Sequence, residues 1–285
     1  MVIRIINRIG YYLFRKPIYY VLSFLGNIQM PKASSEEIDI IIPVIAKDLI
    51  TLPLCLNGIR KNICHNIKDI YLVGPEDDRL IKFAKNEGLK FVNELDVLGF
   101  SPKEVSFVTQ DGRDRSGWLY QQLLKLSGGI GKCQNFVTID SDHVLVRPHV
   151  FITDDGKYVF YRSSEFNWVY IIENYRLLGK FRLPILSYVA HKMVFNKGLL
   201  DNLKEVLERN SGLKWTDAII QSLDNRYASP FSEFELYACF VDNRKKYNKL
   251  WFQKALPRNN SIDIDNIFYN YRKLLSITYP EYLRK

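Results

Sequence analysis

Cysteine is scarce in this chain of 285 residues, and the few cysteines form no recognisable pair. They lie far apart, without a Cys-x-x-Cys motif and without the Cys/His spacing of a zinc site, which argues against a zinc module or a redox dithiol. We expect free thiols and therefore a reducing compartment. The four residues are Cys55, Cys64, Cys133 and Cys239.

No uninterrupted apolar run approaches the roughly 20 residues of a membrane-spanning helix. The most apolar candidate, MVIRIINRIGYYLFRKPIYYVLSFLGNIQMP, is interrupted by Arg15, Lys16 and Pro17, and it lacks the apolar centre and cleavage site of a secretory signal. It carries four basic residues, no acidic one and many aromatics. This pattern predicts an amphipathic segment over residues 1–33, at an anionic membrane surface. The alternative is an ordinary helix packed on the domain.

Signatures of nucleic-acid binding are also missing, because the basic residues are dispersed and no RRM, KH or helix-turn-helix pattern occurs. We expect no nucleic-acid partner. The chain nevertheless has 40 Lys and Arg against 31 Asp and Glu, a formal charge of +9. Such a surplus indicates an anionic partner, such as phospholipid or a phosphorylated small molecule.

What the sequence does contain is a regular alternation of strand-like and helix-like segments. Strands are expected at 38–45, 68–75, 89–93, 135–142 and 157–163. Helices are expected at 52–63, 77–88, 115–129, 187–212, 216–223 and from 232 onward. This order predicts an α/β fold in which helices flank a mostly parallel sheet. We assign it to one domain at 37–245, followed by a basic extension at 246–285 packed on that domain.

Two carboxylates, Asp140 and Asp142, follow directly on the apolar strand NFVTI. In open α/β sheets, ligands bind at the carboxyl ends of the strands. Two unpaired negative charges at such a place would repel one another unless a cation were bound. Carboxylate oxygens suit Mn²⁺ or Mg²⁺, so the pattern predicts a divalent metal shared with a diphosphate.

Three other interpretations remain open at this point. The Asp-x-Asp triplet is short, and two solvated loop carboxylates would look the same. Nucleotidyl transfer also uses strand-end carboxylates, and SGGIGK at 127–132 is a glycine cluster, although it lacks the ending of a P-loop and its position favours a turn. A non-catalytic, membrane-surface binding protein on the same fold is the third interpretation.

Five spaced blocks resemble bacterial proteins of the DUF6492 type, which are similar to GT-A glycosyltransferases. The blocks are IDIIIPVIAKDL, RSGWLYQQLLKL, FVTIDSDHVLVRP, SYVAHKMVFNKGLL and SEFELYACFV, spread over residues 37–245. The resemblance implies a GT-A-like, Rossmann-like domain. It also implies a nucleotide-diphosphate sugar as donor, with Asp142 on the metal and Asp140 on the metal or the ribose.

The resemblance further places the donor around the ends of the first two strands. Pro43, Val44, Gly74 and Pro75 would surround the nucleobase, although plain turn chemistry would account for them equally well. The remaining expected donor contacts are Lys47, Asp48, Arg115 and Gln122.

Arg115 is expected at the start of a helix, whose unpaired amides favour an anion. On that helix Trp118 shares a face with Gln122 and is either a sugar platform or part of the core. Lys125 is expected to be solvated or structural.

An inverting transferase needs a base for the acceptor hydroxyl, usually a carboxylate at the start of a helix. Glu233 is the preferred candidate and Glu235 the reserve, because Ser232 and Glu235 also have the spacing of a capping box. His191 is expected to contact the acceptor or the donor sugar, with a hydrogen-bonded core histidine as the alternative. His143 is either a metal ligand or a residue that supports one.

Together these features predict a metal-dependent glycosyltransferase that acts on a hydroxyl of a lipid-linked or surface polysaccharide acceptor. The basic, aromatic N-terminus would place it in the cytoplasm, peripherally on the inner face of the cell membrane.

Overall fold

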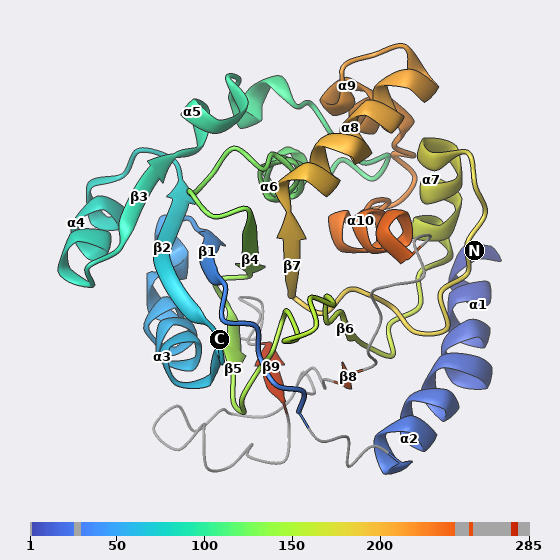
Figure 1. The fold of residues 1–285 in the computed structure, drawn as a ribbon. Coiled ribbons are helices and arrows are strands. Elements are labelled where there is room, and N and C mark those ends of the chain that lie inside the picture. Colours follow the sequence, from blue (N-terminus) through green and yellow to red (C-terminus); the bar gives the residue numbers. More distant parts are fainter. Residues whose placement is uncertain (1, 26–29, 243–250, 253–274, 279–285) are drawn as a thin grey trace.

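The computed structural model describes residues 2–25, 30–242, 251–252 and 275–278 (Figure 1). Five strands form the central sheet in the order β3-β2-β1-β4-β7. All neighbouring pairs are parallel except β4 with β7, which is antiparallel. The predicted α/β fold with a mostly parallel sheet is therefore confirmed. The strands are β1 (Glu37–Pro43), β2 (Asn66–Gly74), β3 (Lys90–Asn93), β4 (Asn135–Ile139) and β7 (Lys192–Asn196).

Strands β1 and β4 lie inside the sheet and are buried almost throughout. Their continuous apolar runs are typical of strands that helices cover on both faces. The helices of this half are α3 (Leu52–Asn62), α4 (Asp78–Asn86), α5 (Glu94–Leu98) and α6 (Ser116–Leu126). Of these, α3, α4 and α6 were predicted and α5 was not. Two short 3₁₀ helices accompany them, η2 (Ala46–Ile50) and η3 (Pro102–Glu104).

The second half of the domain gathers beside β7 (Figure 1). Its helices are α7 (Trp168–Leu178), α8 (Lys197–Ser211), α9 (Trp215–Ser222) and α10 (Glu233–Asp242). Asn167 and Asn196 cap α7 and α8 by accepting a hydrogen bond from a first-turn amide. Gly179 and Gly212 end the same helices in the left-handed conformation.

The prediction of helix over most of 187–212 is wrong for its first part. Residues 192–196 form β7, in which Phe195 pairs with Phe136 of β4. Met193, Val194 and Phe195 are all buried there, so pairing with the sheet outweighs the helical pattern of the sequence. The predicted strand at 157–163 is reduced to β6 (Tyr161–Arg162).

The N-terminal segment is helical, as predicted. It consists of α1 (Val2–Ile9), a π-helical turn η1 (Gly10–Arg15) and α2 (Lys16–Leu25). Asn7 joins α1 to α7, since its amide oxygen accepts from the Trp168 amide at 2.7 Å and its side-chain nitrogen donates to Asn167. Within the described helices, no stretch has both the length and the hydropathy of a membrane span.

Two small sheets connect the C-terminal part of the chain to the domain. Strand β5 (His143–Leu145) pairs antiparallel with β9 (Ser276–Thr278), and β6 pairs parallel with β8 (Trp251–Phe252). The rest of the predicted extension 246–285 lies outside the described residues.

Candidate active site

The site lies where the parallel strands end. Because β1, β2 and β4 run in the same direction, Pro43, Gly74 and Ile139 reach the same edge of the sheet. Asp140 follows Ile139 directly, and Asp142 lies in the turn before β5. The predicted position of the two carboxylates, at the carboxyl edge of the sheet, is confirmed.

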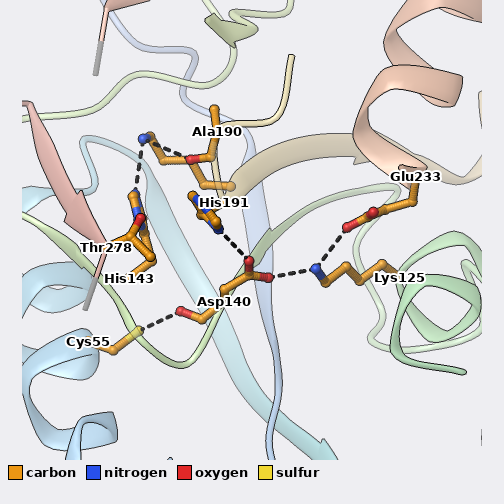
Figure 2. A network of polar contacts seen from close by, with 9 residues as sticks. Cys55, Lys125, Asp140, His143, Ala190, His191, Glu233 and Thr278 are labelled. Atoms are coloured by element: carbon orange, nitrogen blue, oxygen red, sulfur yellow. Dashed lines mark hydrogen bonds and ion pairs between the residues drawn. The ribbon is translucent and has the colours of Figure 1, made fainter. Parts of the chain in front are cut away.

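Asp140 is already bound on both carboxylate oxygens. Lys125 Nζ lies 2.6 Å from Oδ1, and His191 Nδ1 lies 2.9 Å from Oδ2. Figure 2 shows Asp140 between these two residues, with the Cys55 thiol pointing to its backbone carbonyl. The expectation of two unpaired carboxylates is therefore wrong, because a lysine supplies a cation to the first of them.

Lys125 is held in turn by a second carboxylate. Its Nζ lies 2.8 Å from Oε1 of Glu233, and both side chains are 2% exposed (Figure 2). Burial by itself would lower the pKa of Lys125, but Asp140 and Glu233 outweigh it and raise the pKa. Lys125 is thus a buried ammonium at the centre of the site; of the two expected roles, solvated or structural, the first is wrong.

The same contacts set the charge of the two acids. Burial would raise the pKa of Asp140, but the neighbouring Lys125 and His191 lower it well below the usual range. Burial raises the pKa of Glu233, and Lys125 opposes that rise. Asp140 is therefore a fixed anion whose charge is largely balanced inside the protein.

Asp142 differs from Asp140 in both exposure and partners. Its side chain is half-buried, and across the described part of the chain it forms no salt bridge. Burial, followed by the nearby charge of Asp140, raises the pKa of Asp142 to about 6. A nearby cation would stabilise the charged form of Asp142 and so lower its pKa. Asp142 is therefore the carboxylate that a bound metal would stabilise most.

His191 joins the site from the start of β7. Its side chain is 32% exposed, and its backbone carbonyl accepts from the Asp140 amide at 3.0 Å. Its φ of 57° makes it the one described non-glycine residue in the left-handed region. Such strained backbone persists where the surroundings hold it, often at functional sites. The structure thus places His191 beside the carboxylates, as a site residue would be.

Glu235 is separate from this network. It is 4% exposed, and its Oε1 accepts hydrogen bonds from Ser187 Oγ and from the Tyr188 amide at 2.9 Å. Only one of the two hydrogen bonds of the expected capping box is present: Ser232 Oγ accepts from the Glu235 amide at 3.4 Å. The Glu235 side chain binds Ser187 and Tyr188 instead. Glu235 therefore fixes the chain that leads to His191.

The expected nucleobase residues lie at the edge as predicted, and one of them is explained by packing. The Val44 amide donates to the Val73 carbonyl at 2.8 Å. A Cβ on Gly74 would lie 2.1 Å from the Val44 carbonyl oxygen, so only glycine allows the two strand ends to approach so closely. Pro75 follows, half-buried.

Lys47 and Asp48 belong to the turn that follows β1. Asp48 Oδ2 accepts from the Ile45 amide at 3.0 Å, which gives Asp48 a capping role in η2. Its negative charge also contributes to the raised pKa of Asp142, so the two carboxylates are near one another. Lys47 is exposed.

Arg115 and Trp118 lie at the far end of α6 from Lys125 and its carboxylates. Arg115 begins α6, ten residues or about 15 Å along the helix axis from Lys125. Its guanidinium donates to the Ala228 carbonyl at 2.9 Å and lies over the Trp118 ring. Trp118 in turn packs against Phe107, which favours its interpretation as a core residue. Gln122 is buried on α6.

The glycine cluster at 127–132 is not a phosphate loop. It lies before β4, at the opposite edge of the sheet from Asp140. The amides of Lys132 and Cys133 donate to Asp39 Oδ2 at 2.6 and 2.7 Å. Gly131 has a φ of +78°, and a Cβ there would lie 2.4 Å from the same oxygen. The cluster therefore binds an internal carboxylate and gives no support to a phosphate loop.

The donor set at the edge fits a metal that arrives with its substrate. No group of three or more His, Cys, Asp and Glu side chains in the described regions could hold a metal ion alone. Mg²⁺ and similar ions commonly take one or two carboxylates and complete their shell with water and phosphate oxygens. Asp142, with Asp140 beside it, is a donor set of that kind.

Sequence reasoning missed the role of Lys125. In the sequence of α6, Lys125 shares one side of the helix with Gln121 and Gln122, a pattern typical of a solvated face. Only the structure shows that Lys125 is buried, and a buried lysine needs an anion as its partner. The role of the four cysteines, by contrast, is as predicted: all are free, three of them buried and Cys64 exposed.

A comparison with protein-family models assigns the chain directly, because a single model matches residues 35–269. The chain belongs to the DUF6492 family. That family is described as one of unknown function. A search of curated protein sequences finds no match.

Among the solved structures that are similar to the DUF6492 chain over much of its length are two glycosyl-transfer enzymes. Mouse xyloside xylosyltransferase 1 is 10% identical, covers 87% of this chain and 99% of its own, and has a TM-score of 0.46. Glucosyl-3-phosphoglycerate synthase from Mycobacterium tuberculosis, in complex with Mn²⁺, uridine diphosphate and glucosyl-3-phosphoglycerate, is 14% identical. It covers 62% of this chain and 59% of its own, with a TM-score of 0.34. Both likenesses are distant, so the functional argument rests on the site itself.

Proposed function

We propose that this DUF6492 chain is a metal-dependent glycosyltransferase. It moves a sugar from a nucleotide-diphosphate donor to a hydroxyl of a lipid-linked or surface polysaccharide acceptor. The observation that carries the proposal is Asp142: a half-buried carboxylate, with a pKa raised to about 6, at the carboxyl edge of a parallel sheet. This is where open α/β sheets bind ligands.

Asp142, with Asp140 beside it, would hold Mn²⁺ or Mg²⁺. The ion supplies positive charge that stabilises a departing diphosphate. The donor nucleotide would lie along Pro43, Val44, Gly74 and Pro75, with Lys47 and Asp48 within its reach.

The polar network prepares this site before any substrate arrives. Lys125 and His191 fix both oxygens of Asp140, and Glu233 fixes Lys125. Groups held in advance need no reorganisation when charge develops in the transition state. The exposed part of His191 would contact the donor sugar or the acceptor.

The burial of Glu233 and Glu235 argues against the predicted role of either residue as the base. Glu233 and Glu235 are both buried, and each is already bound to protein donors. A base must reach the acceptor hydroxyl within hydrogen-bonding distance. We assign Glu233 and Glu235 to positioning instead. Because transfer with retention requires no such base, the burial of both favours retention over the predicted inversion.

The N-terminal helices would place the site at an anionic membrane surface. Several apolar side chains of this segment remain exposed, such as Leu13 at 66% and Phe14 at 61%. Side chains of this kind, with basic residues among them, favour the interfacial region of a bilayer. Arg15 is an exception to the predicted headgroup contact, because it is buried in the protein. A location on the inner face of the cell membrane, close to a lipid-linked acceptor, is part of the proposal.

The test is a panel of nucleotide-diphosphate sugars with Mn²⁺, measured by thermal stabilisation and by release of the nucleoside diphosphate. The proposal expects at least one donor to stabilise the wild type and to be consumed, only with the metal, and expects Asp142→Ala to lose both effects. Equal stabilisation of wild type and variant by the donors would contradict the metal role of Asp142. No stabilisation of either protein by any donor would favour a non-catalytic membrane-surface protein.

A further inference from the structure

The loop after α7 exposes a second set of apolar side chains. Phe181, Leu183 and Ile185 are 58%, 53% and 63% exposed, and they alternate with Arg182 and Pro184. The sequence from 174 to 200 contains no acidic residue. Exposed apolar residues are common singly, but three at alternate positions of one loop with a basic residue between them are unusual.

This loop lies directly against the N-terminal helices. Arg15 donates to the Pro184 carbonyl at 2.6 Å and to the Glu165 carbonyl at 3.1 Å, and its guanidinium lies over the Phe166 ring. Arg15 is only 3% exposed, while its neighbours Leu13 and Phe14 are mostly exposed. The buried Arg15 therefore connects the N-terminal helices to the loop after α7, and both segments expose apolar side chains close to Arg15.

We propose that residues 180–185 and the N-terminal helices form one interfacial surface, which binds anionic phospholipid through both parts. The proposal rests on the membrane contact proposed above and adds a second element to it. Apolar tips with interspersed basic groups are what an interfacial lipid contact requires. The basic groups here are Arg8, Lys16, Lys180 and Arg182.

Charge decides between lipid and a second copy of the chain. Residues 1–31 and 174–200 contain no acidic residue. A symmetric dimer would place this same basic surface against itself, and the like charges would repel. An anionic lipid surface instead complements both segments.

The surface is also close to the active site along the chain. Ile185 precedes His191 by six residues, which span at most about 20 Å when extended. Between them, Glu235 holds Ser187 and Tyr188 in place. A loop that contacts lipid would therefore keep His191, and Asp140 bound to it, near the bilayer in which a lipid-linked acceptor resides.

Co-sedimentation with vesicles tests the inference, with phosphatidylcholine alone compared with phosphatidylcholine and phosphatidylglycerol at about 3:1. The loop variant is Phe181→Ser, Leu183→Ser and Ile185→Ser, and the helix variant is Leu13→Ser, Phe14→Ser and Val21→Ser. The matched control is Ile50→Ser, Ile81→Ser and Leu95→Ser. These control residues are also exposed and belong to η2, α4 and α5; α4 and α5 pack at the β3 end of the sheet.

We expect the wild type and the control to bind anionic vesicles within twofold of one another. The loop variant and the helix variant should each bind at least tenfold more weakly. Phe181→Ala alone, a milder change that leaves the fold intact, should weaken binding about threefold. These partition ratios, together with unchanged melting temperatures, would support the inference.

Other outcomes overturn it in distinguishable ways. If the loop variant and Phe181→Ala bind like the wild type while the helix variant loses binding, the surface is confined to the helices and only this inference fails. If the wild type does not bind anionic vesicles, the proposed membrane contact fails with it. A wild-type dimer in sedimentation velocity that the loop variant converts to monomer would replace lipid by a second copy.

Discussion

Two buried lysines, Lys125 of α6 and Lys192 of β7, have opposite surroundings. Lys125 lies between the carboxylates of Asp140 and Glu233, and its pKa is raised. Lys192 is 0% exposed and donates to Ser276 Oγ at 2.7 Å, with the His143 ring nitrogen 3.2 Å away. Burial lowers the pKa of Lys192 well below its usual value.

The difference shows that burial by itself does not decide the charge of a side chain. Two carboxylates keep Lys125 charged, and that charge fixes Asp140 at the site. Lys192 instead connects the site to the C-terminal strand: it follows His191, and it contacts His143 and Ser276. Thr278 of the same strand lies 2.9 Å from the other ring nitrogen of His143. One lysine therefore sets the electrostatics of the site, and the other contributes to its framework.

Among the changes that test this comparison, removing the charge of Lys125 should have the largest effect on the free energy of unfolding. Lys125→Met leaves Asp140 and Glu233 near one another without their cation. Loss of one partner of a buried ion pair costs about 3–5 kcal/mol. Urea unfolding should show a fall of that size in the free energy of unfolding. Adding Glu233→Gln to Lys125→Met should restore part of it, and a double variant as unstable as the sum of the two singles would contradict the coupling.

Removing the charge of Asp140 should have an intermediate effect. Asp140→Asn should lower the free energy of unfolding by about 1–3 kcal/mol, since Lys125 keeps Glu233 as a partner and Asp140 is partly exposed. It should also lower the pKa of His191, which the hydrogen bond to Asp140 raises against the opposing effect of burial. An NMR titration of His191 measures this, and an unchanged pKa would show that the hydrogen bond is not formed in solution.

Lys192→Met tests the second lysine of the comparison, whose pKa burial lowers. At pH 7 the free energy of unfolding should fall by less than about 1.5 kcal/mol, because Met has a similar volume and the change removes the hydrogen bond to Ser276. The folded pKa of Lys192 lies well below its unfolded value of about 10.4. Between these values the unfolded state binds more protons, so this residue makes stability rise with pH.

The measurement is urea unfolding of the wild type and Lys192→Met at pH 7, 8 and 9. The wild type should gain stability relative to the variant as the pH rises through this range. Parallel curves for the two proteins would show that Lys192 is charged in the folded state.

The smallest effect is expected for Ser276→Ala, which removes the hydroxyl that accepts from Lys192. A single hydrogen bond contributes about 0.5–1.5 kcal/mol, so the free energy of unfolding should fall by no more than that. Thermal unfolding would detect the change, with Ser35→Ala, at an exposed serine, as the control. A loss comparable to that of Lys125→Met would mean that the two lysines are energetically alike.

The sequence predicted the parts of this molecule that depend on local pattern. The alternation of strands and helices up to β4 follows from apolar periodicity, and the position of Asp140 and Asp142 at the sheet edge follows from that order. The partners of Asp140 did not follow, because Lys125, His191 and Glu233 come from three elements whose meeting depends on tertiary packing. Helix was predicted where β7 lies, so the register that places His191 beside Asp140 could not be derived.

The most direct test of the central claim is a titration with Mn²⁺ in the presence of uridine diphosphate, followed by electron paramagnetic resonance of the free ion. Wild type, Asp142→Asn and Asp201→Asn are compared, since Asp201 is an exposed carboxylate on α8 with a 68% exposed side chain. The account predicts nucleotide-dependent binding of one Mn²⁺ by the wild type and by Asp201→Asn, and at least a tenfold weaker affinity for Asp142→Asn. Equal affinities for all three proteins would show that Asp142 does not hold the metal.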